Sequence, residues 1–172
     1  MRVTSRSART GSTNGRPHSS RGSGVALDDV SKSIIEELQQ DGRRSYAAIG
    51  KVVGLSEAAV RQRVQRLVDS GVMQVVAVTD PLELGFARQA MIGIKATGDL
   101  EPIADRIAAL DEVDYVVITA GSYDLLVEVV CESDEALLSV LSNKIRTIEN
   151  VMSTETFMYL QLRKQTYSWG VR

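Results

Sequence analysis

Residues 45–70 read SYAAIGKVVGLSEAAVRQRVQRLVDS, and this stretch decides how the first half of the chain folds. A short helical pattern ends at Gly54, one apolar residue follows, and Ser56 opens a second, longer helix. Ser45 and Ser56 are favourable N-cap residues, and a glycine at position 54 permits the left-handed turn that ends a helix. Two helices joined by so tight a turn predict a helix-turn-helix, whose second helix enters the major groove of DNA.

The second of these helices has two different faces. Its buried face is predicted by apolar residues at helical spacing, namely Val60, Val64, Leu67 and Val68. The opposite face carries small or amide side chains with arginines at its edges. Glutamine can bond adenine through two hydrogen bonds, and arginine can bond guanine or phosphate, so this face can read DNA. An ordinary solvated basic face is the alternative that the pattern leaves open.

Two further arginines, Arg43 and Arg44, precede the first helix of the pair and are well placed for backbone phosphates. A helix-turn-helix binds DNA through both its reading helix and its flanking turns. The candidate DNA-binding residues are therefore Arg43, Arg44, Ser45, Ser56, Ala58, Arg61, Gln62, Arg63, Gln65 and Arg66.

The formal net charge of −2 conceals a strong asymmetry along the chain. Residues 1–26 contain five arginines and no acidic residue, which gives them a net charge of +5. Seven basic and seven acidic residues balance in 27–79, whereas eight basic against fifteen acidic residues give 80–172 a net charge of −7. A polyanion such as double-stranded DNA therefore belongs with the first half, and the acidic second half should avoid nucleic acid.

The chain contains one histidine and one cysteine, which excludes many enzyme classes. His18 lies in a low-complexity segment, so the folded part offers no histidine for a catalytic triad, a general base or a zinc site. Cys131 lies in an apolar stretch and is expected to be a buried side chain, not a reactive thiol. We predict no enzyme activity, no catalytic residues, no metal site and no cofactor. The absence of an apolar run long enough for a membrane span or a signal peptide predicts a cytoplasmic protein.

The first domain is expected over residues 27–79. Residues 1–26 are rich in Ser, Gly, Arg and Thr and predict a disordered basic tail, because they have little apolar surface to offset the entropy lost on ordering. That tail is either a basic arm that attracts DNA of any sequence or a solvated tail without a task. Residues 28–40 predict the first helix. Residues 72–79 resemble a strand, which is either a wing or a link, and 80–87 are the predicted linker.

Residues 88–162 alternate between strand and helix patterns. Strands are expected over 89–96, 113–120, 124–131 and 151–162, and helices over 100–110 and 134–147; the second helix should turn Leu137, Leu138, Leu141 and Ile145 inward. The order βαββαβ is typical of a ferredoxin-like domain. Residues 163–172, with Trp169, form a C-terminal tail that either packs on the protein or frays. The predicted fold class is α+β, a winged helix-turn-helix followed by a ferredoxin-like domain for ligand binding and oligomerisation.

The predicted strands are apolar on both faces. In 124–131, Leu125 and Val127 point one way, while Leu126 and Val130 join Glu128 on the other side. Helices cover only one face of a ferredoxin-like sheet, and one chain has no third layer for the second face. Self-association with twofold symmetry is the simplest answer, and it supplies two recognition helices about one duplex turn apart.

The chain resembles the Lrp/AsnC family of bacterial and archaeal transcription regulators. The resemblance is carried by LDDVSKSIIEELQQDGRRSYAAIGKVVGLSEAAVRQRVQRLVDSGVMQ from residue 27, DEVDYVVITAGSYDLLVEVVC from residue 111, and LLSVLSNKIRTIENVMSTET from residue 137. The Gly-Ser-Tyr-Asp turn at 121–124, together with Thr154-x-Thr156, makes the resemblance specific. The stretch NKIRTIENVMSTET is closer to the asparagine-responsive branch than to the leucine-responsive one.

This resemblance implies a sequence-specific transcription regulator that responds to a small amino acid and controls genes of amino-acid metabolism. It implies dimers that pair through their sheets and assemble further, often into octamers, with the effector at the contact between dimers. The effector-binding residues that it implies are Gly121, Ser122, Tyr123, Asp124, Met152, Ser153, Thr154 and Thr156. A hairpin turn without a ligand is the alternative for 121–124.

The chemistry of these residues is compatible with a zwitterion. Asp124 can accept hydrogen bonds from an ammonium group, while backbone N–H groups and hydroxyls can donate to a carboxylate. Met152 departs from the polar residue expected in asparagine-like members, which implies an effector side chain less polar than that of asparagine. Two other functions stay open: an architectural protein that wraps DNA with little effector control, and the amino-acid-sensing module of an enzyme.

Overall fold

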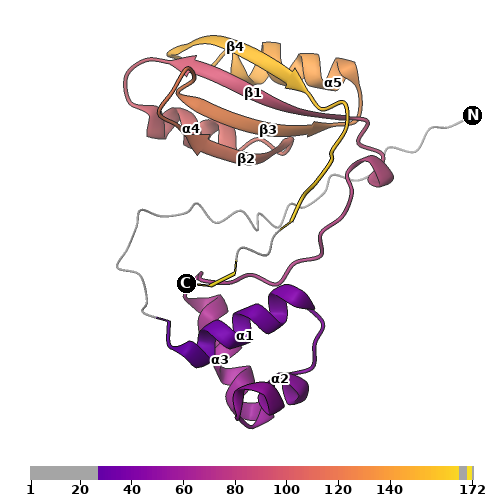
Figure 1. Ribbon diagram of the computed structural model, residues 1–172. Helices are drawn as coiled ribbons and strands as arrows, with labels where there is room; N and C mark the ends of the chain where they lie inside the picture. Colours follow the sequence, from indigo (N-terminus) through magenta and orange to yellow (C-terminus); the bar gives the residue numbers. More distant parts are fainter. Residues whose placement is uncertain (1–26, 167–169, 172) are drawn as a thin grey trace, which may run out of the picture. The chain divides into compact units, whose positions relative to one another are not determined.

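The structure is a computed structural model that describes residues 27–166 and 170–171 (Figure 1). Contacts divide the chain between Met73 and Gln74 into two compact units, each with its own core. The predicted basic tail, His18 and Trp169 lie outside the described residues.

The first unit consists of three helices. They are α1 (Asp29–Gln40), α2 (Tyr46–Val53) and α3 (Glu57–Asp69). Each begins at a side-chain cap, because Asp28, Ser45 and Ser56 accept hydrogen bonds from backbone N–H groups three residues further along. The helices pack around a small apolar core of Ile34, Ile49, Val60 and Val64.

The turn between α2 and α3 depends on two glycines. Gly54 caps α2 in the left-handed conformation with φ of 73°, which a side chain would disfavour. The N–H of Leu55 then donates to the carbonyl oxygen of Gly50 at 2.9 Å, and a Cβ on Gly50 would lie 2.4 Å from the Leu55 carbonyl oxygen. The chain can therefore reverse this sharply only with glycine at position 50.

Residues 72–79, which the sequence leaves open as either a wing or a link, form no strand. Residues 72–79 have no ladder partner within the described chain, and the side chains of Val75, Val76 and Val78 are 58%, 64% and 59% exposed. A wing requires a hairpin whose strands bond to each other, and no such hairpin is present in these residues. Of the two predicted alternatives, the connecting segment is the one observed, and it leads into the short 3₁₀ helix η1 (Leu82–Leu84).

The second unit has a four-stranded antiparallel sheet with helices on one face. In chain order its elements are β1 (Arg88–Ala96), α4 (Leu100–Ala108), β2 (Val113–Ile118), β3 (Leu125–Cys131), α5 (Asp134–Ser139), the π-helical η2 (Val140–Ile145) and β4 (Val151–Met158). The strands lie in the order β2-β3-β1-β4, and every neighbouring pair is antiparallel. This confirms the α+β class and the ferredoxin-like βαββαβ order.

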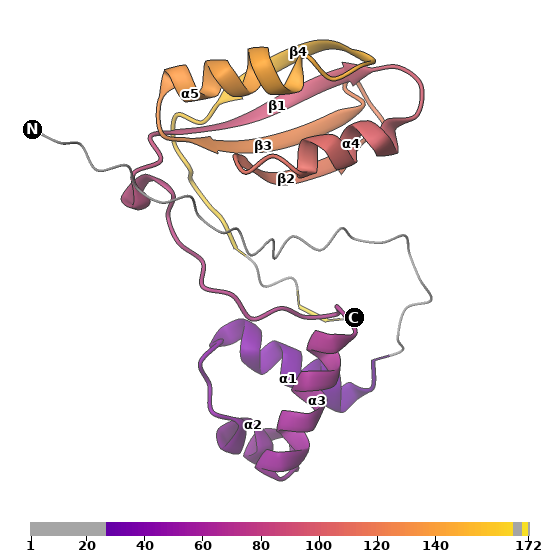
Figure 2. The same ribbon diagram turned by 180° about the vertical axis from the view of Figure 1, so that it is seen from behind.

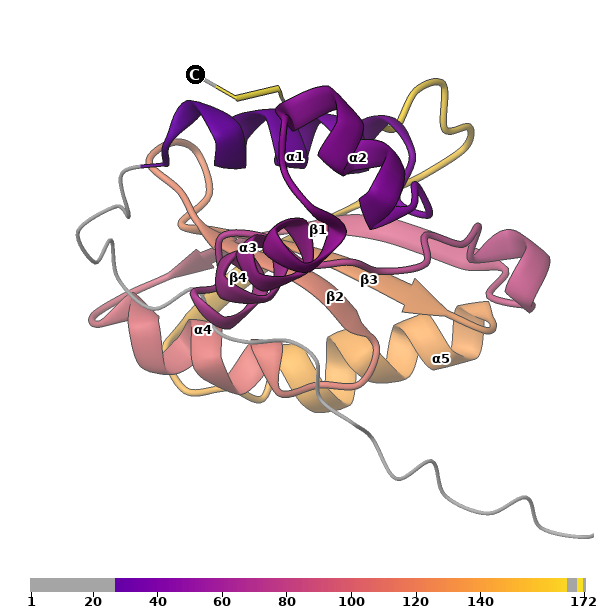
Figure 3. The ribbon, with the colours of Figure 1, turned by 90° about the horizontal axis from the view of Figure 1, so that it is seen from below.

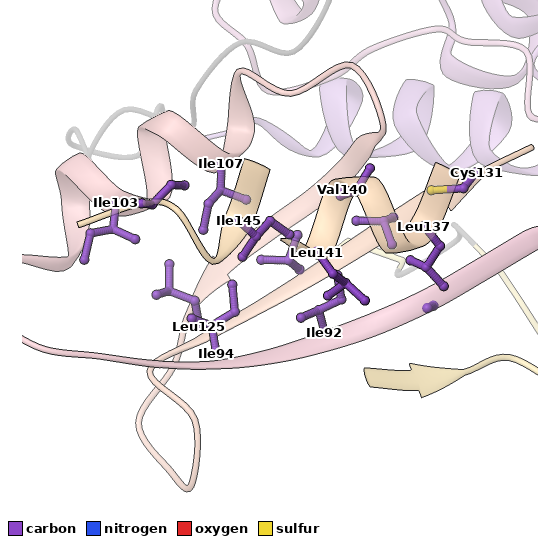
Figure 4. Close-up of a cluster of buried hydrophobic side chains, with 14 residues drawn as sticks. Ile92, Ile94, Ile103, Ile107, Leu125, Cys131, Leu137, Val140, Leu141 and Ile145 are labelled. Carbon is purple, nitrogen blue, oxygen red and sulfur yellow. The ribbon is translucent and has the colours of Figure 1, made fainter. Parts of the chain in front are cut away.

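Figure 2 shows α4 and α5 in front of the sheet, and Figure 3 shows both helices along the same side of the strands. The core between the two layers is apolar (Figure 4): Ile92, Ile94 and Leu125 from the sheet meet Ile107 and Ile145 from the helical layer. The predicted buried position of Cys131 is confirmed, since 2% of it is exposed.

Three predicted details of this unit are wrong. Leu138 is 62% exposed and does not point inward, because it lies on the outer side of α5. The predicted helix over 134–147 changes from α-helical to π-helical at Val140. The last strand ends at Met158 and does not reach residue 162, because β1 begins at Arg88 and beyond Met158 β1 accepts only the N–H of Tyr159, at Gln89 O.

Within the described residues of the second unit, both helices lie on one face of the sheet and the second face carries none (Figure 1). The strand registers place Met91, Gly93 and Leu126 on this open face, with Tyr115 and Phe157 at 50% and 43% exposure. The expectation of an apolar second face is confirmed in part, because Glu128, which pairs with Met91, and Glu155, which pairs with Gly93, lie on this face as well.

Candidate functional site

The outward face of α3 has the composition that the sequence predicts. Ala58, Gln62 and Arg66 are exposed, and the opposite face buries Val60, Val64 and Leu67 in the core. The helix therefore presents amide and guanidinium groups to solvent on a rigid support. These groups can donate and accept hydrogen bonds at base edges.

Two side chains of this face are held by their own helix. Arg61 donates to Glu57 at 2.8 Å and lies 5.2 Å from the ring centroid of Tyr46, and Gln65 donates to Asp69 at 2.8 Å. Exposed pairs of this kind contribute only about 0–1 kcal/mol. Both side chains can therefore leave these partners for DNA at little cost.

Arg63 is placed differently from the prediction. Its Nη1 donates to Asp28 Oδ2 at 2.6 Å and to Ser31 Oγ at 3.0 Å, so it joins α3 to the start of α1. The bonds from Ser31 and Arg63 lower the pKa of Asp28 to about 2. The side chain therefore joins α3 to the start of α1, and its contact with DNA stays a prediction.

The arginines before α2 also differ from each other. Arg44 forms an ion pair with Glu37, whereas the backbone N–H of Arg43 donates to Asp41 at 2.9 Å and its side chain is exposed. Ser45 and Ser56 serve as caps, and the free N–H groups that follow such caps attract anions. Of the two arginines, Arg43 is the one that is exposed and takes part in none of the ion pairs found among residues 27–166, and its contact with phosphate stays a prediction.

The predicted effector turn is bonded to the end of β1. The N–H of Asp124 donates to Ile94 O at 2.9 Å, and Asp124 Oδ2 accepts the N–H of Ala96 at 2.9 Å. Thr119 Oγ1 donates to the carbonyl oxygen of Tyr123 at 2.6 Å. The carboxylate of Asp124 thus has one oxygen engaged by the backbone and one that can accept a ligand's hydrogen bond.

Tyr123 lies on the open face of the sheet. Its ring is over Gly93, its hydroxyl donates to Glu155, and its ring centroid is 6.0 Å from that of Phe157 in an edge-on arrangement. The hydrogen bond to Glu155 raises the pKa of the Tyr123 phenol above its usual range. Gly121 and Ser122, at the tip of the turn, are both exposed.

The β4 residues of the predicted site divide between the two faces of the sheet. Thr154 and Thr156 pair with Ile94 and Ile92, and so share the helix-covered face, whereas Ser153 pairs with Lys95 on the other face. Met152 is 68% exposed. The structure brings these residues to the same end of the sheet as the turn. Within one chain, however, they lie on different faces and do not surround a single binding point.

Three residues near this site were missed from the sequence. Gly93 lies under the ring of Tyr123, and Glu155 accepts the hydrogen bond of its hydroxyl. Arg146 donates from Nε to Thr154 Oγ1 at 2.9 Å. The alternation of β4 would have placed Glu155 with Phe157, opposite Thr154. The contact made by Arg146 follows from a π-helical turn, which no pattern of apolar residues indicates.

A separate groove lies away from the predicted effector residues. It has a volume of 270 Å³ and is lined by residues 78–82 and by residues of the 159–165 segment, with Ala87 and Gln89. No group of His, Cys, Asp and Glu side chains within the described ranges could hold a metal ion. None of the described helices is long and apolar enough to cross a membrane.

Both units match known protein families. Residues 27–68 match the AsnC-type helix-turn-helix domain, and residues 89–169 match the Lrp/AsnC ligand binding domain. An HTH-type transcriptional regulator from Pyrococcus furiosus is 36% identical over 148 residues, covering 85% of this chain and 97% of that protein. The regulatory protein AsnC of Escherichia coli is 33% identical over 138 residues, covering 78% and 91%.

Solved structures agree with these matches. The structure of E. coli AsnC has a TM-score of 0.70 at 31% identity and covers 82% of this chain and 97% of its own. The leucine response regulatory protein of Mycobacterium tuberculosis has a TM-score of 0.72 at 30% identity and covers 81% and 96%. A Neisseria meningitidis transcriptional regulator, solved as an L-Met complex, shares the fold with a TM-score of 0.71 at 21% identity and covers 85% and 96%. With both of its domains matched, the chain is a member of the Lrp/AsnC family, whose proteins are transcriptional regulators with a DNA-binding and a ligand-binding domain and are not enzymes.

Proposed function

We propose that this regulator reads a specific operator with α3 and that a small amino acid, bound at the 121–124 turn and β4, controls its action on genes of amino-acid metabolism in the cytoplasm. The observation that carries the DNA part is the exposed face of α3, where Gln62 lies between arginines on a helix anchored by buried valines. The effector part is supported by the matched ligand-binding domain and by the partly free carboxylate of Asp124.

The amino acid class of the effector has independent support from a protein of the same fold. The N. meningitidis regulator was solved with L-Met, an amino acid whose side chain is less polar than that of asparagine. The exposed Met152 in this chain fits such a side chain better than a polar residue would. A moderately apolar amino acid is therefore the first ligand to test.

The open face of the sheet supports the proposal that the working form is an oligomer. An exposed apolar face that includes Tyr115 and Phe157 is costly in water, and a twofold pair of such faces removes it from solvent. The pairing also gives a second copy of α3 for the second half of an operator. We propose a dimer as the unit and an octamer as the further assembly.

The DNA assignment is tested by comparing two substitutions on operator and random DNA. Gln62→Ala should lower the preference for operator by about 1–3 kcal/mol, because one base contact is lost. Arg43→Ala should weaken binding to all DNA and reduce the salt slope by about 1. Gln40→Ala, an exposed glutamine at the end of α1, is the control and should change neither quantity. If Gln62→Ala affects operator and random DNA equally, Gln62 is not a base reader.

The effector assignment is tested by a thermal-shift screen of the standard amino acids, followed by DNA-binding assays with the best ligand. Asp124→Asn keeps an oxygen for the Ala96 N–H but removes the charge that would bind an ammonium group. It should abolish the effector response and leave DNA binding intact, whereas Asp111→Asn, an exposed acid of the same unit, should respond normally. If millimolar amino acids change neither the melting temperature nor DNA binding, the effector assignment is contradicted and the architectural DNA-wrapping alternative is favoured.

Oligomerisation is tested by light scattering. Tyr115→Lys puts a charge on the open face and should reduce the molar mass in solution. Leu138→Lys puts the same charge on the exposed side of α5 and should not. Equal masses for both variants would contradict the open face as the interface.

A further inference from the structure

Arg146 lies where the helical layer of the second unit meets the edge strand β4. Its Nε donates to Thr154 Oγ1 at 2.9 Å, and the residue is exposed. None of the ion pairs found among residues 27–166 includes it. The guanidinium therefore keeps its charge and its Nη donors available to a ligand.

The backbone around Arg146 is irregular at three points. The helix leading to it ends in the π-helical η2, and the Arg146 N–H donates to Leu141 O at 3.0 Å, five residues earlier. Asn150, just before β4, has a φ of 69°. The pairing of β1 with β4 shifts register between Lys95 and Ala96. Irregularities of these kinds gather next to binding sites, where they redirect a side chain.

The pair formed by Arg146 and Thr154 lies close to the predicted effector turn in the sheet. Thr154 pairs with Ile94, and the carbonyl oxygen of Ile94 accepts the N–H of Asp124 at 2.9 Å. A single residue of β1 thus separates Thr154 from the turn. Several described basic residues of the second unit form no ion pair, but among them Arg146 is the one whose side chain bonds to a residue of the predicted effector site.

We propose that Arg146, oriented by Thr154, binds a carboxylate of the amino-acid effector. The planar guanidinium can make two parallel hydrogen bonds to a carboxylate, which a hydroxyl or one backbone N–H cannot. The inference rests on the effector part of the proposed function. The carboxylate is either the α-carboxylate of any amino acid or the side-chain carboxylate of an acidic one, and the choice of ligands separates these sources.

The test titrates the full-length wild type and Arg146→Gln by calorimetry with L-methionine, L-methioninamide, L-aspartate and L-asparagine. Arg146→Gln keeps a polar side chain but removes the charge and the paired donors. It should weaken binding by about ten- to a hundredfold, as expected for the loss of a charge-assisted hydrogen bond. Arg106→Gln, an exposed arginine on α4, is the matched control and should bind as the wild type does. Thr154→Val, which removes only the hydroxyl that orients Arg146, should lose part of the affinity.

The ligands distinguish the two carboxylates. If Arg146 binds the α-carboxylate, the wild type binds methionine and not methioninamide, and Arg146→Gln loses affinity for methionine. If it binds a side-chain carboxylate, the wild type prefers aspartate to asparagine and Arg146→Gln loses that preference. An unchanged Kd in Arg146→Gln and Thr154→Val for an amino acid that the wild type binds overturns the role of Arg146 alone. A wild type that binds no standard amino acid overturns the effector proposal and this inference together.

Discussion

The ring of Tyr123 lies over the backbone of Gly93, so closely that a Cβ at position 93 would be 2.8 Å from three ring carbons. This contact joins the predicted effector turn to the open face of the sheet. The hydroxyl of Tyr123 donates to Glu155, and its ring makes an edge-on contact with the ring of Phe157. Tyr123 therefore contacts three residues of the open face. The turn and the face therefore cannot rearrange independently of each other.

Gly93→Ala should destabilise the second unit, because the added methyl group displaces the Tyr123 ring from Glu155 and Phe157. Overpacking of this kind costs about 1–3 kcal/mol, and urea unfolding measures it. The double variant Gly93→Ala/Tyr123→Ala removes the clash and should lose less than the sum of the two single changes. Strict additivity of the two changes would contradict the contact.

Gly50→Ala should disrupt the turn of the helix-turn-helix. The added Cβ would lie 2.4 Å from the Leu55 carbonyl oxygen, a backbone atom that cannot move without opening the turn. The loss should reach the upper end of about 1–3 kcal/mol, and affinity for all DNA should fall with it. Gly42→Ala, whose Cβ would meet only Leu38 O at 3.8 Å, is the control. Comparable unfolding curves for the two variants would show that the turn tolerates a side chain.

The hydrogen bonds that Asp28 accepts from Ser31 and Arg63 should make the first unit sensitive to acid. The pKa of Asp28 falls from 3.8 to about 2 on folding, so its contribution is complete above pH 4 and is lost as the pH falls toward 2. Arg63→Gln should flatten the decline of the melting temperature between these pH values. Asp29→Asn, which changes the neighbouring exposed acid, should leave it unaltered. An identical pH profile for Arg63→Gln and the wild type would refute the coupling.

Cys131 should resist alkylation in the native protein. The thiol is 2% exposed, and burial together with the nearby Glu112 raises its pKa, so little thiolate forms. Because the chain has one cysteine, mass spectrometry after iodoacetamide treatment reports this site alone. The native protein should stay unlabelled over a period in which the urea-unfolded protein reacts fully. Similar labelling rates in both states would mean that β3 opens readily.

The sequence predicts the three helices of the first unit closely because the signals are local. Caps such as Ser45 and Ser56 and the apolar spacing of α3 lie within a few residues of the structure that they specify. The contact between Arg63 and Asp28 was not predicted, because Asp28 lies 35 residues away and no pattern within α3 reveals it. Arg43 and Arg44 look equivalent in the sequence and differ only because Glu37 is within reach of one of them.

In the second unit, the alternation of side chains along the sequence predicts the strands and their two faces. The positions of the site residues depend in addition on the pairing register of β4 with β1. Thr154 and Ser153 point to opposite faces because of how β4 pairs with β1, which follows from the whole sheet. The π-helical turn that positions Arg146 has more residues per turn than an α-helix, and the amino-acid composition of the segment does not reveal this. The strand-like residues 72–79 have no partner strand in the part of the chain that the structure describes, so their β-branched sequence alone does not make them a wing.

Under the proposed function, the position of Tyr123 would link effector binding at the 121–124 turn to self-association through the open face. A ligand that shifts the 121–124 turn changes the surface that a second copy would cover, and by thermodynamic reciprocity the second copy changes the affinity for the ligand. The apparent effector affinity should consequently depend on protein concentration. A regulator built in this way senses its own abundance as well as its amino acid, so the amount of protein in the cell helps to set the concentration at which it responds.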